Sequence, residues 1–312
     1  MRHKFTFFTA FSTSLAILLL TLNPLYTANA TVFKHKLDVQ LRADDRSGRD
    51  LRYQYRVRYY PSVSFSDSLS VNGFVVTGDD FSSSHNTIDD SSADHFYLRR
   101  AFVRHSGDYG KTEVGIIPTF KGRVSSSGLS KDGWIQGIRH VRNTGNKGQF
   151  ELVAGELNNV DPRKAIDAPN TIDYLEAEYS ASYNEQISYE FSLERMTSAN
   201  FMRTELRYAY AESHTAFAEL VKRADATKIK TVLGVEGEFR SKDKPYEYFV
   251  YYSYVSDDFG LKAELTEDFL GTGHGFSAEI ESSFSFAPLN WFIRFDKVDN
   301  SSRMLGGIKW SL

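Results

Sequence analysis

Polar and apolar residues alternate one by one over many short segments of this chain, and this alternation constrains the fold more than any other feature. In residues 51–59 the apolar set is Leu51, Tyr53, Tyr55, Val57 and Tyr59, and the polar set between them is Arg52, Gln54, Arg56 and Arg58. A period of two places the sets on opposite faces of a β-strand, because successive side chains of a strand point in opposite directions. The segment is therefore predicted to be a strand with one apolar and one basic face.

The same alternation returns along the whole chain. Apolar sets of this kind are Phe33, Leu37, Val39 and Leu41; Leu175, Ala177, Tyr179 and Ala181; Ile187, Tyr189, Phe191 and Leu193; Phe276, Ala278 and Ile280; and Trp291, Ile293 and Phe295. The residues between them are mostly polar or charged. Helical spacing fits none of these segments, so an all-β fold is predicted.

Short and long connections alternate between the predicted strands. The short ones lie at residues 66–68, 107–110, 146–148, 184–185, 242–245 and 287–289, and the longer polar ones at residues 43–50, 79–94, 121–133, 158–173 and 257–275. Short periplasmic turns that alternate with longer external loops are typical of outer-membrane β-barrels. Counted in this way, the chain has about sixteen strands, within a range of roughly fourteen to eighteen.

Residues 1–30 have the pattern of a cleaved export signal. A basic start at Arg2 and Lys4 precedes the uncharged apolar stretch 11–22, and Ala28 and Ala30 are the small residues that a signal peptidase recognises. The stretch is shorter than the roughly 20 residues of a membrane-spanning helix. We therefore expect residues 1–30 to be a signal peptide and residues 31–312 to form one β-barrel domain in the outer membrane of a Gram-negative cell.

A soluble β-sandwich is the alternative fold, since its strands could pack their apolar faces against each other across a core. The export signal, the alternation of turns and loops, and the 18 tyrosines and 24 phenylalanines favour the barrel. Lipid excludes unpaired backbone groups, so the sheet has to close without an edge. The fold class predicted is an all-β, transmembrane antiparallel β-barrel.

Closure of the barrel turns the charged faces inward. About sixteen strands leave a water-filled lumen, whereas about eight would be filled by side chains. The predicted pore-lining residues are Lys34, Lys36, Arg52, Arg56 and Arg58 on early strands and Glu151, Glu176, Glu178, Glu190, Glu194, Glu236, Glu238, Glu279 and Glu281 on later ones. Opposed basic and acidic walls would produce a transverse field that orients dipolar solutes and disfavours apolar ones.

One block of the sequence resembles a known family. Tyr97-Leu98-Arg99-Arg100-Ala101, followed by Gly107-Asp108-Tyr109-Gly110 and Thr112-Glu113-Val114-Gly115, is similar to the strand-turn-strand block of Gram-negative diffusion porins, and the sixteen-strand layout resembles theirs. The resemblance implies a homotrimer whose third external loop folds into the lumen. That loop corresponds to residues 121–133, with Lys121, Arg123 and Lys131 as constriction-loop candidates. Two features depart from the family: this loop is basic rather than acidic, and the chain ends in leucine rather than in an aromatic residue.

The chain contains no complete catalytic or cofactor motif. Gly110-Lys111-Thr112 lacks the earlier glycine of a phosphate-binding loop, and His105 and Ser106 would point to opposite faces of a strand. The aspartates of residues 79–94 favour a solvated loop over a calcium site, which needs six to eight converging oxygens. The chain has no cysteine, and its net charge of −3 gives no basis for binding nucleic acid. We therefore expect no enzyme, no cofactor, no metal and no nucleic-acid partner.

These observations predict an outer-membrane porin for the passive diffusion of small hydrophilic solutes and ions, in contact with outer-membrane lipid and lipopolysaccharide. A channel that prefers anions, sugar acids or oligosaccharides fits the same charged walls. The alternatives from another class are an outer-membrane barrel enzyme and a structural or adhesin barrel with a plugged lumen. Single-channel conductance distinguishes a pore from a plugged barrel.

Overall fold

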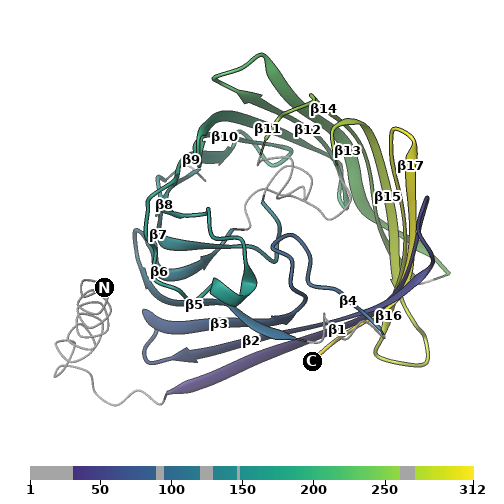
Figure 1. The fold of residues 1–312 in the computed structure, drawn as a ribbon, viewed down its shortest axis with the longest axis horizontal. Coiled ribbons are helices and arrows are strands. Elements are labelled where there is room, and N and C mark those ends of the chain that lie inside the picture. The colour runs from purple at the N-terminus through teal and green to yellow at the C-terminus, as the bar shows by residue number, and fades with distance from the viewer. Residues whose placement is uncertain (1–30, 89–94, 120–128, 146–147, 243, 261–270) are drawn as a thin grey trace, which may run out of the picture.

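A computed structural model of the chain describes residues 31–88, 95–119, 129–145, 148–242, 244–260 and 271–312. Sixteen strands of these residues form the wall of the barrel shown in Figure 1, and a seventeenth, β4, is only two residues long. No helix in this part of the chain has the length and apolarity needed to cross a bilayer. The predicted signal peptide, residues 1–30, lies outside the described residues.

The strands follow the alternating segments of the sequence. They are β1 (Val32–Arg46), β2 (Arg52–Ser64), β3 (Leu69–Thr77), β4 (Asn86–Thr87), β5 (Phe96–Gly107), β6 (Gly110–Pro118), β7 (Trp134–Asn143), β8 (Gly148–Glu156), β9 (Tyr174–Ser182), β10 (Ile187–Met196), β11 (Ala199–Ala211), β12 (His214–Arg223), β13 (Lys228–Ser241), β14 (Lys244–Val255), β15 (Gly273–Ser283), β16 (Asn290–Val298) and β17 (Ser301–Ser311). A single turn of 3₁₀ helix, η1 (Pro162–Lys164), lies between β8 and β9.

The ring of strands closes between β1 and β17. The pairing is antiparallel and runs from Asp38 opposite Ser311 to Arg46 opposite Arg303, while the other side of β1 pairs with β2. Leu37 and Leu312 exchange two further backbone hydrogen bonds, of 3.0 and 2.9 Å. Each of the sixteen described barrel strands thus has two neighbours, which leaves no open sheet edge among them. The predicted closed antiparallel barrel is confirmed.

Alternation along each strand determines which side chains face the interior. On β11, Arg203 and Glu205 are buried inside the barrel, whereas Met202 and Leu206 are 42% and 52% exposed on the outside. Large apolar side chains are exposed in the same way on the outer faces of most strands. An apolar outer face around a polar interior is the arrangement of a barrel in lipid rather than of a soluble sandwich.

The two ends of the barrel differ. At the short-turn end, tight turns join pairs such as β5 and β6; at the long-loop end, longer segments join β3 to β5, β6 to β7, β8 to β9 and β14 to β15. An apolar cluster fills part of the interior near the long-loop end. Its members come from inward faces of strands, such as Phe201 and Tyr174, and from the long connections, such as Phe81, Leu157 and Phe259.

Three predicted loops contain strand residues. The loop expected at 43–50 begins only after Arg46, because Ala43 and Asp44 still pair with Tyr53 and Arg52 of β2. The loop expected at 79–94 includes β4, which pairs with β2 beyond the end of β3. The last residues of the loop expected at 257–275 belong to β15, which pairs with β14 from Gly273 onward.

Candidate functional site

A β-bulge on β5 turns two consecutive arginine side chains into the barrel. In the pairing of β3 with β5, Phe74 lies opposite Arg100 and Val75 lies opposite Leu98, so Arg99 is an extra residue. An extra residue interrupts the alternation of a strand. Arg99 and Arg100 are accordingly both buried, at 0% and 7% exposure, while Leu98 is 40% exposed on the outside.

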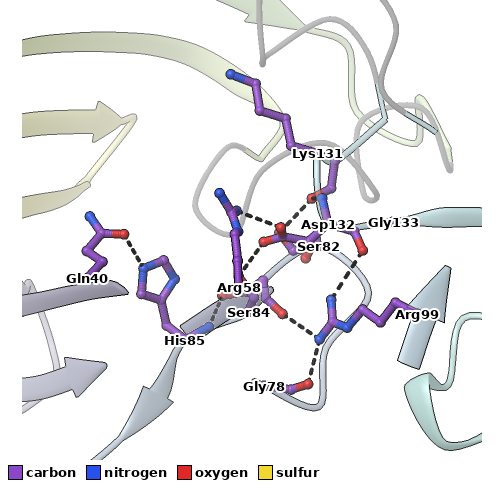
Figure 2. A network of polar contacts seen from close by, with 12 residues as sticks. Gln40, Arg58, Gly78, Ser82, Ser84, His85, Arg99, Lys131, Asp132 and Gly133 are labelled. Carbon is purple, nitrogen blue, oxygen red and sulfur yellow. Dashed lines mark hydrogen bonds and ion pairs between the residues drawn. The ribbon is translucent and has the colours of Figure 1, made fainter. Parts of the chain in front are cut away.

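The two arginines bind two inward segments, which we define as residues 78–87 after β3 and residues 129–133 before β7. Arg99 donates from Nη2 to the carbonyl oxygens of Gly78 at 2.5 Å and Ser83 at 3.1 Å. Arg100 donates from Nε to the carbonyl oxygen of Gly133 at 2.8 Å and from Nη2 to that of Lys131. Figure 2 shows Arg99 reaching both segments. The bulge therefore holds the inward segments against the inner wall.

Gly78 is the residue at which the chain leaves β3 and turns inward. Its φ of +84° lies in the left-handed region that favours glycine, and a Cβ there would stand 2.7 Å from the backbone of Ser84. The segment is then fixed by Thr77, whose hydroxyl donates to the carbonyl oxygen of Ser84 at 2.7 Å. Phe81 at its tip packs against Trp134, with 4.7 Å between the ring centroids.

Asp132 connects the inward segments to the barrel wall. Its carboxylate accepts from the Ser84 hydroxyl at 2.5 Å and forms an ion pair with Nη2 of Arg58 on β2 at 2.6 Å (Figure 2). Burial alone would raise the pKa of the Asp132 carboxyl, but the adjacent charges of Arg58 and Arg56 hold this pKa well below its usual range. Asp132 is therefore an anion throughout the physiological pH range.

His85 lies on the other inward segment, residues 78–87, and is neutral. Its Nε2 is 2.9 Å from Oε1 of Gln40 on β1. Burial lowers the pKa of the His85 imidazole well below its ordinary value, and the positive charges of Arg42 and Arg56 lower it further. His85 adds a hydrogen-bonding group to this part of the interior, but no charge.

A cavity of 250 Å³ lies between the inward segments and the inner wall. Its charged lining residues are seven cations, Arg42, Arg56, Arg58, Lys131, Arg294, Arg303 and Lys309, and two carboxylates, Asp132 and Glu279. Asp296, buried behind the lining, accepts from Arg294 and Arg303 at 2.8 Å each. Phe249, Phe292 and Leu305 form the apolar part of the surface. We call this the arginine cavity.

The opposite part of the interior is acidic. Arg203 on β11 lies among four glutamates, with nitrogen–oxygen distances of 2.5 Å to Glu219, 2.6 Å to Glu190, 3.1 Å to Glu205 and 3.8 Å to Glu178. All five side chains are at least nine-tenths buried. One cation therefore binds four neighbouring carboxylates on β9 to β12.

The structure places the predicted basic residues at different heights along the wall. Lys34 and Lys36 are exposed at the short-turn end of β1, where Lys36 pairs with Asp38 at 3.2 Å. Arg52 pairs with Asp44 at 2.6 Å near the long-loop end. Only Arg56 and Arg58 of this set line the arginine cavity. The other lining cations, Arg42, Arg294, Arg303 and Lys309, were not among the predicted residues.

The predicted glutamates form three groups. Glu151, Glu176, Glu178, Glu190 and Glu194 lie on the inward faces of β8 to β10, across the ring from β1 and β2 and close to Arg139 and Arg203. On β13, Glu236 forms an ion pair with Arg207, and Glu238 forms one with Arg240. Glu279 and Glu281 bind Lys309 on β17.

The expected separation of charges fails for Glu279 and Glu281. Their strand, β15, is followed around the ring by β16, β17 and β1, so it belongs to the basic side. These two glutamates also line a second cavity, of 490 Å³, toward the short-turn end, together with Glu212, Glu236, Glu238 and Glu247. Phe249 and Glu279 line both cavities.

The constriction-loop candidates fall on the second inward segment and before it. Lys131 is exposed, and its backbone carbonyl accepts from Arg100. Lys121 and Arg123 lie outside the described residues. Among the residues that the structure describes, no group of three or more histidine, aspartate or glutamate side chains is arranged to hold a metal ion.

No family model and no curated protein matches the chain. Solved structures share its fold: a triple mutant of Rhodopseudomonas blastica porin has a TM-score of 0.64 and 11% identity, over 90% of this chain and 100% of that chain. A high-pH structure of Pseudomonas putida OprB has a TM-score of 0.63 and 11% identity, over 90% and 94%. A loop-deletion mutant of OmpT, an outer membrane protein of Vibrio cholerae, has a TM-score of 0.56 and 11% identity, over 91% and 100%. The chain thus has the fold of these outer-membrane barrels, and its resemblance to porins is confirmed for the fold.

Proposed function

We propose that this protein is an outer-membrane porin through which small hydrophilic solutes and ions diffuse passively. The observation that carries the proposal is the charged interior of a closed barrel, in which the arginine cavity and the second, glutamate-lined cavity adjoin at Phe249 and Glu279. Barrels of about sixteen strands are wide enough for an aqueous channel. A polar interior of this width supports conduction rather than a packed core.

The predicted pore-lining residues are part of this proposal. We assign the solute path to the side of the barrel formed by β13 to β17, β1 and β2, because both cavities lie there. The apolar cluster and the Arg203 group occupy the inner side of β5 to β12, the cluster reaching Val255 of β14, and would narrow the remaining space. Lys131 and the inward segments would form the narrow part of the path.

Export, membrane contacts and assembly complete the proposal. Residues 1–30 would direct export of the chain and be cleaved, and the apolar outer face would contact lipid and, at the external rim, lipopolysaccharide. We also propose a homotrimer, as the sequence resemblance implies. The outer faces of β3 and β5 are candidates for the contact, because Gly73 and Ala101, which carry little or no side chain, lie opposite each other there.

Planar-bilayer recording tests the channel, and single cysteines identify its lining, because the chain has no cysteine of its own. Glu236→Cys lies on the inward face of β13, whereas Leu233→Cys lies on its outward face, where Leu233 is 56% exposed. A charged, impermeant thiol reagent should reduce the conductance of Glu236→Cys and leave that of Leu233→Cys unchanged. A folded barrel that neither conducts ions nor lets small sugars swell liposomes would support a structural barrel instead.

A further inference from the structure

We propose that the arginine cavity is a binding site for small organic carboxylates that pass through the barrel. This specificity rests on the channel function proposed above. It goes beyond that function in assigning a preferred class of solute and the residues that select it.

Arg56 is the first observation behind this proposal. Its side chain lines the cavity, and its Nε is buried without a hydrogen-bond acceptor. Neither a hydrogen bond nor an ion pair joins Arg56 to the residues that the structure describes, whereas Arg58 binds Asp132 and Arg303 binds Asp296. A buried guanidinium without an acceptor is costly, and an anionic ligand would supply the acceptor.

The charge of the cavity is the second observation. Seven cations line it, and four carboxylates either line it or bind those cations from behind: Asp132, Glu279, Glu281 and Asp296. The lining cations outnumber the lining carboxylates, and charges enclosed among protein atoms are screened less than in water. An anion would therefore be attracted more strongly here than at the exposed ends of the barrel.

Asp132 indicates which anion fits. Its carboxylate already lies at the cavity wall, 2.6 Å from Nη2 of Arg58 and adjacent to Arg56. A solute carboxylate could occupy the equivalent position on Arg56, because guanidinium and carboxylate groups match as planar, bidentate partners. Asp132 would then compete with the solute for Arg58.

The volume limits the size of the ligand. The space of 250 Å³ lies just below the roughly 300–1,000 Å³ of pockets that hold drug-sized ligands. It therefore suits a small organic acid, such as succinate, better than an oligosaccharide. The apolar surface of Phe292 and Leu305 would contact the carbon chain of such an acid.

Chloride current through the purified barrel in planar bilayers, recorded at pH 8 with increasing succinate, tests the inference. Succinate should reduce the current in a saturable way. Its half-saturating concentration should rise about tenfold or more in Arg56→Gln, the factor expected for one lost charge-assisted hydrogen bond. Arg56→Lys keeps the positive charge but not the planar guanidinium, so its half-saturating concentration should lie between those of the wild type and Arg56→Gln. Asp132→Asn should lower the half-saturating concentration, because it releases Arg58.

Arg195→Gln is the matched control, since Arg195 is exposed on the outer face of β10. This substitution should leave the half-saturating concentration of succinate unchanged. Folding of each variant is verified by heat-modifiable migration in gels. An unchanged half-saturating concentration in Arg56→Gln would overturn the site, as would inorganic phosphate acting at lower concentration than succinate. Chloride current that is insensitive to succinate would refute the carboxylate site alone, whereas the absence of any current would refute the channel itself.

Discussion

Replacing Arg203 with methionine should destabilise the barrel by about 3–5 kcal/mol. The guanidinium contacts Glu190 and Glu219 at 2.6 and 2.5 Å and is itself 1% exposed. Methionine fills a similar volume but removes the cation that Glu190 and Glu219 contact, whereas Glu205 keeps its ion pair with Arg207. Breaking a buried ion pair by removing one partner costs about this amount, because the remaining charge is neither hydrated nor neutralised.

The loss should depend on pH. Carboxylates without a cation can be neutralised by protonation when the pH falls, so the difference between Arg203→Met and the wild type should shrink from pH 8 to pH 5. Addition of Glu219→Gln to Arg203→Met should restore part of the stability, since it removes one of the negative charges that Arg203 offsets. Both effects follow from electrostatics and would not follow from a packing defect.

Urea unfolding of the barrel in lipid vesicles, followed by tryptophan fluorescence, measures these free energies. Arg195→Met is the control, because it removes an exposed arginine from the neighbouring strand and should change stability by no more than about 0.5 kcal/mol. A free energy of unfolding for Arg203→Met within about 1 kcal/mol of the wild-type value, or a loss of stability that grows on acidification, would refute the role of Arg203 as a buried counter-charge.

Four further outcomes are expected. Arg99→Leu should release the inward segments, seen as faster proteolysis within residues 78–87 and a larger single-channel conductance; unchanged cleavage would show that the bulge does not hold them. On intact cells, Asp167→Cys between β8 and β9 should react with an impermeant thiol reagent and Asp67→Cys in the β2–β3 turn should not, and the reverse result would invert the proposed orientation. The pKa of His85 is lowered in the folded barrel, so below about pH 6.5 His85 is protonated in the unfolded chain but not in the barrel, and stability should fall by up to about 1.4 kcal/mol per pH unit. His85→Gln should lessen this fall, and a pH profile of stability identical to that of the wild type would contradict the role of His85. Deletion of residues 309–312 should abolish heat-modifiable barrel in outer-membrane fractions, and normal accumulation would show that the end of β17 is dispensable for closure.

The fold could be predicted because the alternation of β-strands is local. Residues 51–59 identify both the strand β2 and its two faces without reference to any other segment, and the same holds for β9, β10 and β16. The number of strands then follows from their recurrence along the chain. Closure follows from lipid, which admits no open sheet edge.

The site depends on non-local relations that alternation does not contain. The bulge at Arg99 exists only relative to β3, because an extra residue is defined by the strand opposite. The pairing of Lys309 with Glu279 depends on the register of three adjacent strands, so the sequence alone placed Glu279 on the wrong side. One signal was available: Phe81 and Leu129 are isolated apolar residues in polar connections, and both are buried in the interior.

The seam between β1 and β17 determines when the barrel can be completed. Asp38 and Ser311, whose side chains bond across this seam at 2.5 Å, are 273 positions apart in the chain. Contacts of such long sequence separation form late, because loop closure has to precede them. Until β17 arrives, β1 and β16 each present an unpaired edge that could template aggregation. We therefore expect the chain to need a factor that shields strand edges during transit, and its rate of membrane insertion to be set by completion of the last strand rather than by synthesis of the first.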